Sequence, residues 1–408
     1  MRLWKVSRAL TFAFIAAVMV ASGVFYGLVF LLDFQEIDTT AKLDAKTLFD
    51  LVKLSFGVVA GSGALVALVV AYRRQRVDEA GAHREATRLH TERFSQAVDK
   101  LGSDSPAVRL GGVHALAGLA DDAPDDSLRQ TCIDVLCAYL QLPFTPDPGN
   151  DPADQEQRHR YLAFRKVRHT ILRLIGDHYS RPQETHRSWQ GCDLDLTGVT
   201  VDCQVSFDGA EFSDGRVSFD RAVFSDGSVS FYGAVFSGGW VSFYGADLSG
   251  GKLSFGRAKI SGGEVSFGGA KFAGGEVSFD GAEFSGGGVI FYSAEFSGSR
   301  VSFDHTEFSS SWVPFDGAVF SRSPVSFGHA EFSGGQASFR GAVFSGGEVS
   351  FDHAVLSGGQ MPFNNAVFSG TQVSFNYTTG SAPRGLLAAV GTPAPAGVSL
   401  PSAWLSVP

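Results

Sequence analysis

Three histidines recur every 24 residues in the C-terminal half of the chain, at His305, His329 and His353. If the chain folds with a 24-residue repeat, their side chains form an exposed column with a spacing of about 5 Å. Imidazoles at that distance can share a metal ion or respond together to pH. Turn positions also tolerate histidine, however, and no column of carboxylates accompanies the three residues. We therefore predict no metal site there.

The remaining residues that carry chemistry do not form a catalytic set. The four cysteines, Cys132, Cys137, Cys192 and Cys203, show no C-x-x-C spacing, which favours buried thiols over a metal or redox pair. No G-x-S-x-G, P-loop or dinucleotide-binding pattern occurs, and the many glycines follow a repeat instead. We predict a protein that is not an enzyme, without catalytic, cofactor-binding or metal-binding residues.

The histidines belong to a twelve-residue repeat that occupies residues 205–378. Its first copy reads V-S-F-D-G-A-E-F-S-D-G-R, and Phe207 recurs at every twelfth position up to Phe375. A short, fixed period is typical of a solenoid. The Val-x-Phe and Ala-x-Phe triplets alternate as short strands do, and the glycines between them supply corners. In the first copy, the side chains predicted to face inwards are Val205, Phe207, Ala210 and Phe212.

Two coil sizes fit this period, a flat coil of twelve residues and a four-sided coil of 24. Halving the perimeter leaves roughly a quarter of the enclosed area for half of the side chains, so the smaller coil would be overpacked. Surface residues also recur with the longer period, as the histidines do. We therefore favour the four-sided coil, which places Trp240 in a column with Glu264. Roughly seven coils would make a rod about 35 Å long.

The repeats resemble the pentapeptide-repeat family, whose repeat is written A-[DN]-L-x-x. Residues 246–250 read A-D-L-S-G, and A-x-F-S-x recurs in nearly every copy. The resemblance implies a right-handed, four-sided β-helix with Leu or Phe stacked beneath Ala. This chain departs from the family by spacing its large inward residues alternately five and seven apart. Only residues 194–201 keep the five-residue step.

Residues 1–72 are predicted to be a two-helix membrane anchor. Two apolar runs, at about 9–32 and 52–72, are long enough to span a bilayer, and only 18% of the whole chain is charged. Arginines and lysines flank the outer ends of both runs, which predicts that both termini are cytoplasmic. This indicates a multi-pass protein of the cell (inner/plasma) membrane. Cleavage of the first run near Ala21 as a signal peptide is the alternative.

Pairs of glycines in the two apolar runs suggest close helix contacts. The sequence has Gly23-x-x-x-Gly27 in the first run and Gly57-x-x-x-Gly61 in the second. Such spacing lets two helices, or two copies of the chain, approach closely, so homo-oligomerisation through these helices is expected. Merely tolerated glycines are the alternative.

Residues 73–190 are predicted to form a cytoplasmic stalk and a small helical region. Ser105-Pro106 is typical of a helix start, and apolar positions up to Leu140 indicate two short helices in a HEAT-like hairpin. Gly111-Gly112 would weaken the first helix unless a neighbour packs there. The segment 101–120 also resembles the region between the anchor and the repeats in bacterial membrane-bound pentapeptide-repeat proteins. That family shares no common biochemical activity.

A basic helix is predicted over residues 154–179, after a proline-rich linker at 143–152. Its arginines are compatible with nucleic acid or lipid headgroups. We interpret them instead as a solvated face, or as a counter-charge to the acidic solenoid.

The solenoid is assigned to residues 191–380, and residues 381–408 are assigned to a cap and a disordered tail. Leu386, Leu387 and Val390 are expected to cover the last coil, because an uncovered sheet edge invites pairing with other chains. Beyond residue 392 the Pro, Ala, Gly and Ser content leads us to expect disorder.

The architecture predicts a membrane-tethered interaction scaffold that presents the solenoid to the cytoplasm for an unidentified protein partner. A binding surface needs exposed anchors, and aromatic residues are unneeded in outward positions of the repeat. The candidate anchors are Tyr232, Trp240, Tyr244, Tyr292 and Trp312. Scattered surface aromatics without a binding role are the alternative.

The charge of the repeats suggests a second function. Residues 203–378 carry 17 Asp and Glu against 9 Lys and Arg. Some pentapeptide-repeat proteins use such an acidic rod to imitate duplex DNA, so the resemblance implies possible action on a topoisomerase or another nucleic-acid-binding protein. Interspersed Lys252, Lys259 and Lys271, together with the predicted tether, argue against that function. We do not expect the chain to bind nucleic acid.

Overall fold

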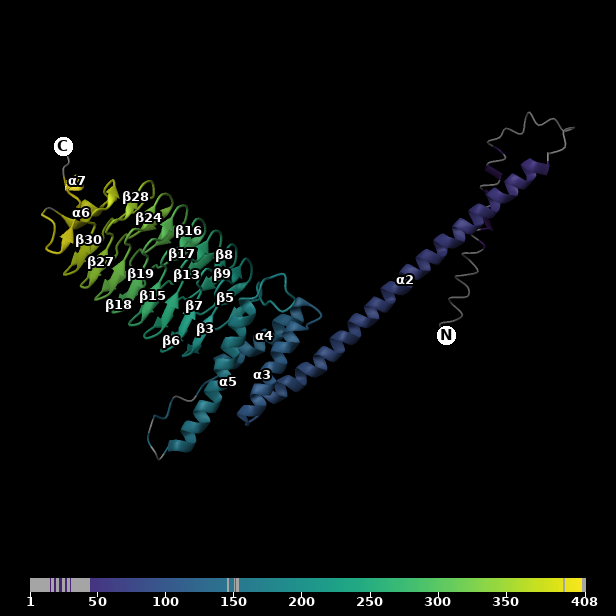
Figure 1. The fold of residues 1–408 in the computed structure, drawn as a ribbon, viewed down its shortest axis with the longest axis horizontal. Coiled ribbons are helices and arrows are strands. Elements are labelled where there is room, and N and C mark those ends of the chain that lie inside the picture. Colours follow the sequence, from purple (N-terminus) through teal and green to yellow (C-terminus); the bar gives the residue numbers. More distant parts are fainter. Residues whose placement is uncertain are drawn as a thin grey trace. The chain divides into compact units, whose positions relative to one another are not determined.

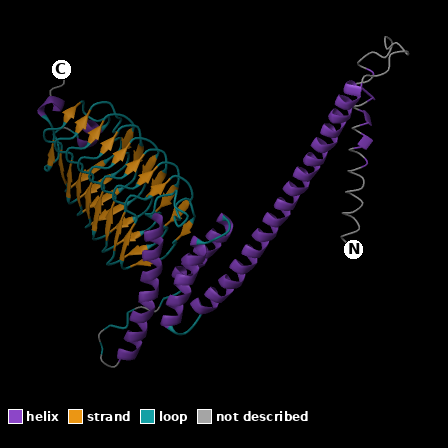
Figure 2. Ribbon diagram, turned by 45° about the vertical axis from the view of Figure 1, so that its right-hand side comes forward, coloured by secondary structure: helices purple, strands orange, loops and turns teal. Residues whose placement is uncertain are grey.

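Four parallel β-sheets form a four-sided solenoid in the C-terminal part of the chain (Figures 1 and 2). The computed structural model describes residues 45–144, 147–149, 151, 154–391 and 393–405, with isolated positions between 15 and 30. The chain divides into two compact units, Met1–Leu89 and His90–Pro408, whose residues contact mainly others of the same unit. The solenoid and the helices next to it belong to the second unit.

Most coils contribute one strand of two or three residues to each sheet. Sheet A contains β1 (Leu194–Asp195), β5 (Arg216–Ser218), β9 (Trp240–Ser242), β13 (Glu264–Ser266), β17 (Gly288–Ile290), β21 (Trp312–Pro314) and β25 (Gln336–Ser338). Sheet B contains β2 (Thr200–Val201), β6 (Val223–Phe224), β10 (Asp247–Leu248), β14 (Lys271–Phe272), β18 (Glu295–Ser297), β22 (Val319–Ser321), β26 (Val343–Ser345) and β29 (Val367–Ser369).

The other two sides of the coil complete the solenoid. Sheet C contains β3 (Gln204–Ser206), β7 (Ser228–Ser230), β11 (Lys252–Ser254), β15 (Glu276–Ser278), β19 (Arg300–Ser302), β23 (Pro324–Ser326), β27 (Glu348–Ser350), β30 (Gln372–Ser374) and β32 (Val398–Ser399). Sheet D contains β4 (Glu211–Phe212), β8 (Val235–Phe236), β12 (Lys259–Ile260), β16 (Glu283–Phe284), β20 (Glu307–Phe308), β24 (Glu331–Phe332), β28 (Val355–Leu356) and β31 (Thr379–Gly380). The stack exceeds the seven coils expected, because β1, β2 and β32 lie outside the repeats and join it.

The strand register confirms the 24-residue coil. Val205 pairs with Val229 in sheet C, and Phe212 pairs with Phe236 in sheet D. In the first coil the offset is 23 residues, since Leu194 pairs with Val217. This shorter coil coincides with the segment 194–201 that keeps the five-residue step.

Stacked phenylalanines fill the interior of the solenoid. Phe279 lies flat against Phe303, one coil away, with ring centroids 4.8 Å apart. Phe267 and Phe279, from opposite sides of the coil, meet edge to face at 5.8 Å. Both geometries are favoured by aromatic rings. Thr306, which replaces alanine at one inward position, is fully buried and donates its hydroxyl to the Phe279 carbonyl at 2.9 Å, so its polar group is satisfied.

Aspartates at the corners link successive coils. Asp304 Oδ1 accepts hydrogen bonds from the Ser326 hydroxyl and from the Gly328 N–H, the latter at 2.8 Å. The same pairing of an aspartate with a serine 22 residues later involves Asp208, Asp220, Asp280, Asp316 and Asp352. The sequence carries this signal as V-S-F-D, but the period alone does not reveal that the serine and aspartate of different coils meet.

Helices α3 (Pro106–Asp121) and α4 (Asp126–Gln141) pack against each other as the predicted helical pair. Ser105 is the N-cap of α3, and Pro106 occupies its first turn. A Cβ at Gly112 would lie 2.6 Å from the Leu101 nitrogen, at the end of α2 (Ala45–Leu101). Gly112 therefore permits the close approach of a neighbouring helix.

Helix α5 (Gln155–Tyr179) covers the first coils of the solenoid (Figure 1). A Cβ at Gly176 would lie 2.5 Å from the Ser206 carbonyl oxygen, so only glycine allows this contact. Tyr179 is fully buried and stacks on Phe212 at 5.3 Å. The helix thus shields the N-terminal edge of the core from solvent and from edge-to-edge pairing.

The C-terminal residues cover the other end. Leu386 and Val390, on α6 (Leu386–Val390), are buried, and Leu387 is half-buried. Residues 393–405, for which the sequence predicts disorder, include β32 and α7 (Ser402–Leu405). Trp404 accounts for this order: it packs on Phe375 at 5.5 Å, and its Nε1 donates to the Gly380 carbonyl at 2.8 Å.

The predicted membrane anchor requires a correction. Across the described part of the chain, no helix combines the length and apolar character needed to cross a bilayer. The run at 9–32 lies largely outside the described residues, and the run at 52–72 is part of the 57-residue helix α2. Arginines follow that run from Arg73. This finding contradicts the predictions of two transmembrane helices and of a multi-pass membrane location with cytoplasmic termini. It also contradicts the predictions of membrane binding and of oligomerisation through these helices.

Candidate interaction surface

Two tryptophans lie in one outward column of sheet A, of which Trp240 is half-buried and Trp312 is exposed. Trp240 pairs with Glu264, as the 24-residue coil predicts, and Trp312 pairs with Gly288. The Trp240 Nε1 donates to Glu264 Oε1 at 3.2 Å, and the Arg216 guanidinium lies 4.8 Å from the indole centroid. Neighbouring coils therefore hold the Trp240 ring in one orientation. Trp312 lies beside a glycine and remains 51% exposed.

Two tyrosines lie at the corner between sheets A and B. Tyr244 and Tyr292 are two coils apart and are 56% and 60% exposed. Gly268 occupies the same corner position between them, and a Cβ there would lie 3.2 Å from the Tyr244 ring. Because Trp240 and Tyr244 belong to the same coil, the structure brings four of the predicted anchors to one edge of the solenoid. We call these four residues, Trp240, Tyr244, Tyr292 and Trp312, the aromatic edge.

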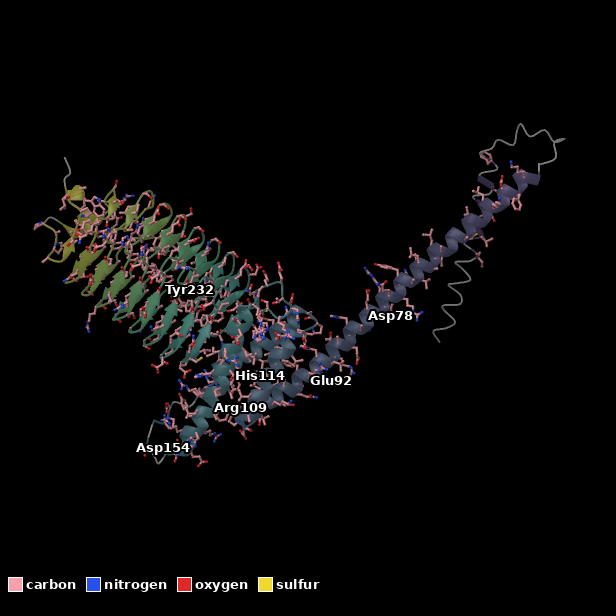
Figure 3. The ribbon with its side chains drawn as sticks, viewed as in Figure 1. Asp78, Glu92, Arg109, His114, Asp154 and Tyr232 are labelled. Carbon is pink, nitrogen blue, oxygen red and sulfur yellow. The ribbon has the colours of Figure 1, made fainter. Side chains whose placement is uncertain are left out.

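Tyr232 lies apart from the aromatic edge. It follows sheet C in the coil, at the corner before sheet D, which is diagonally opposite the corner of Tyr244 and Tyr292 (Figure 3 labels Tyr232). The Arg257 guanidinium lies 5.8 Å from its ring centroid. The fifth predicted anchor therefore does not share a surface with the other four.

The histidine column forms as the 24-residue period predicts. The ring centroids of His305 and His329 are 5.0 Å apart, those of His329 and His353 are 4.8 Å apart, and Tyr377 continues the stack. Of the residues the structure describes, the three histidines do not belong to any group of three potential metal ligands. The column is thus a flat stack of rings at the corner between sheets C and D.

Sheet D carries a row of glutamates beside this corner. Glu283, Glu307 and Glu331 pair in register on successive strands. Lys259 forms an ion pair with Glu283 at 3.2 Å, and on sheet C Lys252 pairs with Glu276 at 3.1 Å. The negative charge of the repeats is therefore partly neutralised between neighbouring coils.

A group of polar residues joins α5 to the solenoid. His169, Asp202 and Cys203 have ligand atoms within 4.8 Å of one another, a spacing that a metal ion could bridge. Arg165 Nε, however, donates to Asp202 Oδ2 at 2.6 Å, and His169 Nε2 lies 2.7 Å from Oδ1. Burial raises the pKa of Cys203 to about 11, so its thiol stays protonated. The arrangement fits an ion-pair network better than a metal site.

The same network sets the charge of Asp202. Burial alone would raise the pKa of this carboxyl, but hydrogen bonds from His169 and Arg165 outweigh burial and lower the pKa to about 2. Arg165 and His169 are four residues apart and share one face of α5. That spacing is visible in the sequence, but the partner Asp202 becomes apparent only when the helix docks.

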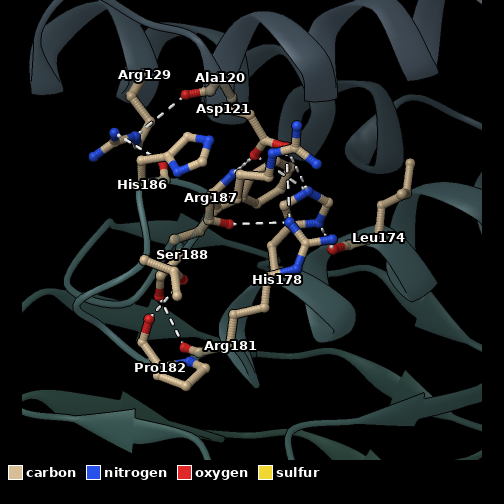
Figure 4. Close-up of polar contacts among 12 residues, drawn as sticks. Ala120, Asp121, Arg129, Leu174, His178, Arg181, Pro182, His186, Arg187 and Ser188 are labelled. Atoms are coloured by element: carbon tan, nitrogen blue, oxygen red, sulfur yellow. Dashed lines mark hydrogen bonds and ion pairs between the residues drawn. The ribbon is translucent and has the colours of Figure 1, made fainter.

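A second buried network holds the segment between α5 and β1 (Figure 4). Asp121 Oδ1 accepts a hydrogen bond from Trp189 Nε1 at 3.1 Å, and the His178 Nε2 lies 3.2 Å from the same oxygen. His178 Nδ1 lies 2.6 Å from the Leu174 carbonyl oxygen. Both His178 nitrogens thus face acceptors. His178 also stacks on Trp189 at 4.2 Å, so this network serves packing.

The cysteines are unpaired thiols. Cys132 and Cys137 are buried, as predicted, and Cys192 and Cys203 are half-buried. Burial raises the pKa of Cys132 to about 11 and that of Cys137 to about 12, which disfavours the reactive thiolate.

No family model, curated protein or solved structure matches this chain. The architecture itself, with four parallel sheets and 24-residue coils, is consistent with a pentapeptide-repeat-like solenoid.

Proposed function

We propose that this protein is a non-enzymatic β-solenoid scaffold that binds a protein partner through the aromatic edge. The observation that carries the proposal is the gathering of Trp240, Tyr244, Tyr292 and Trp312 on one side of a rigid stack of coils. Tyrosine and tryptophan are enriched at binding hot spots, because they offer large contact areas with few rotatable bonds. Tyr244, Tyr292 and Trp312 are more than half exposed, so packing within the solenoid does not account for these three rings.

The aromatic edge suits a protein better than a small molecule. Three coils separate Trp240 from Trp312, a span of about 14 Å along the stack. Trp240 is already fixed by Arg216 and Glu264, so little side-chain entropy is lost when a partner docks. A convex edge with anchors at this spacing fits an extended segment or a flat face of another protein.

We further propose that the chain is a variant of the bacterial pentapeptide-repeat class, on the strength of its coil length and its stacked Phe and Ala. Imitation of DNA is the second function that this class suggests. The ion pairs of Lys252 and Lys259 with glutamates of the next coil interrupt the negative surface that such imitation needs. A protein partner at the aromatic edge is therefore the stronger proposal.

The test compares two single variants of the full chain. Trp312→Ser removes an anchor of the aromatic edge, whereas Tyr232→Ser removes a ring of similar exposure from the corner between sheets C and D. The wild type should capture a set of proteins from the cells of origin, and Tyr232→Ser should capture the same set while Trp312→Ser should lose it. The two variants should have equal melting temperatures, which shows that the loss is not due to unfolding. A captured set that both variants retain would contradict the proposal. Inhibition of a topoisomerase by the pure chain would favour DNA imitation.

A further inference from the structure

A pocket of about 520 Å³ lies between α3, α4 and α5, away from the aromatic edge. Three arginines line it, Arg109 from α3 and Arg160 and Arg168 from α5 (Figure 3 labels Arg109). Its other walls include the rings of Phe144, Tyr161 and Phe164. None of the described residues that line it carries a carboxylate, so the pocket combines positive charge with flat apolar surface.

Arg168 is the distinctive residue of this pocket. Its side chain is only 7% exposed, and its guanidinium lies 4.9 Å from the Phe144 ring centroid. Among the described residues it has no hydrogen-bond acceptor and no ion-pair partner. The carboxylate that acts on it electrostatically, Asp202, is engaged by Arg165 and His169. A buried cation without a counter-ion is costly, and burial lowers the pKa of Arg168 accordingly.

The two other arginines also have no carboxylate partner among the described residues, although Arg109 Nε donates to the Ser103 carbonyl. Arg109 Nη1 donates to the Tyr139 hydroxyl at 3.0 Å, and its guanidinium lies 4.6 Å from the Phe164 ring centroid. Arg160 is exposed and lies 5.8 Å from the same ring. By contrast, Arg165 on the same helix is paired with an aspartate. Among the described residues, none of the three arginines that line the pocket forms an ion pair with a carboxylate, whereas Arg165 and Arg173 of the same helix do.

We propose that this pocket binds a small phosphorylated aromatic compound of the nucleoside monophosphate type, with the phosphate at Arg168 and Arg109. A phosphate monoester brings close to two negative charges, and guanidinium groups bind its oxygens in a planar, bidentate manner. The walls of Phe144, Tyr161 and Phe164 offer flat surfaces against which a planar ring can stack. The volume lies within the range of small-molecule sites, roughly 300–1,000 Å³. This proposal is independent of the aromatic edge.

The experiment is calorimetric titration of the full chain with adenosine monophosphate, inorganic phosphate, adenosine and benzoate. The monophosphate should bind saturably and more tightly than each of the other three compounds. Arg168→Met, which keeps an apolar side chain of similar length, should weaken this binding by at least about tenfold, as expected for the loss of a charge-assisted hydrogen bond. Raising the salt concentration should weaken binding in the wild type.

Two further variants separate binding from folding. Arg173→Gln changes an arginine of the same helix that pairs with Asp177 outside the pocket, and it should bind as the wild type does. Arg160→Gln alters an exposed side chain, so it should fold normally and weaken binding several-fold even if Arg168→Met does not fold. Without ligand, Arg168→Met should melt at or above the wild-type temperature, because no counter-ion loses a partner.

Three results would overturn the proposal. The first is that the wild type binds none of the four compounds saturably. The second is that Arg160→Gln and a folded Arg168→Met bind the monophosphate as tightly as the wild type. The third is that adenosine or benzoate binds as tightly as the monophosphate, which would remove the phosphate from the assignment.

Discussion

His305 stacks face to face on His329, one coil further along the solenoid, with their ring centroids 5.0 Å apart. This stacking requires a coil of 24 residues, which cross-linking in solution can test. Cysteines introduced by His305→Cys and His329→Cys should be joined by a short bifunctional reagent, whereas His305→Cys and Gly317→Cys should not, because residue 317 lies at the opposite corner. Peptide mapping by mass spectrometry reads out the pairs. Preferential joining of 305 to 317 would indicate a twelve-residue coil.

The Phe279 ring should be among the most costly side chains to remove. It is fully buried between stacked rings, and the backbone of neighbouring coils restricts collapse into a cavity. Phe279→Ala is expected to lower the free energy of unfolding by about 3–5 kcal/mol. Glu283→Gln, four residues away on the surface, should change it by less than about 1 kcal/mol. Denaturant titration measures both, and equal effects would mean that the inward and outward faces are assigned incorrectly.

Asp202 should make the junction of α5 with the solenoid sensitive to acid. Its folded pKa of about 2 lies below the ordinary value of about 3.9. The depressed pKa therefore stabilises the fold fully above pH 4, by about 2 kcal/mol, and this stabilisation is lost as pH falls through the folded pKa. The stability of Asp202→Asn should lie below that of the wild type at pH 6, and the two should converge towards pH 2. The exposed variant Asp214→Asn serves as the control, and a gap that persists at pH 2 would speak against this origin.

The solenoid is predictable from sequence because its code is local and repeated. Phe207 and its equivalents specify the inward face and the twelve-residue period, and the volume of their rings favours the 24-residue coil. The contact between Asp202 and Arg165 has no such code, because it depends on where α5 docks. The burial of Arg168 likewise arises only when α3, α4 and α5 meet. At Trp404 the sequence-based expectation was wrong. The Pro-rich composition of the C-terminal residues predicts disorder, but the buried Trp404 side chain orders them.

The corner aspartates should contribute to stability through hydrogen bonds between successive coils. Asp304→Ala removes the acceptor for the Ser326 hydroxyl and the Gly328 N–H, and we expect a loss of about 1–3 kcal/mol. Asp304→Asn retains an oxygen acceptor without the charge, so its loss should be smaller.

Hydrogen exchange at Gly328 distinguishes this local bond from a general loss of stability. The Gly328 amide should exchange faster in Asp304→Ala than in the wild type, by more than the amides of the adjoining strands, because its acceptor is removed. Asp226→Ala, at an exposed corner position, should leave both the stability and this amide unchanged. If Asp304→Ala and Asp226→Ala behave alike, the corner carboxylates are ordinary surface charges, and the coils are held together by their backbone ladders and stacked rings alone.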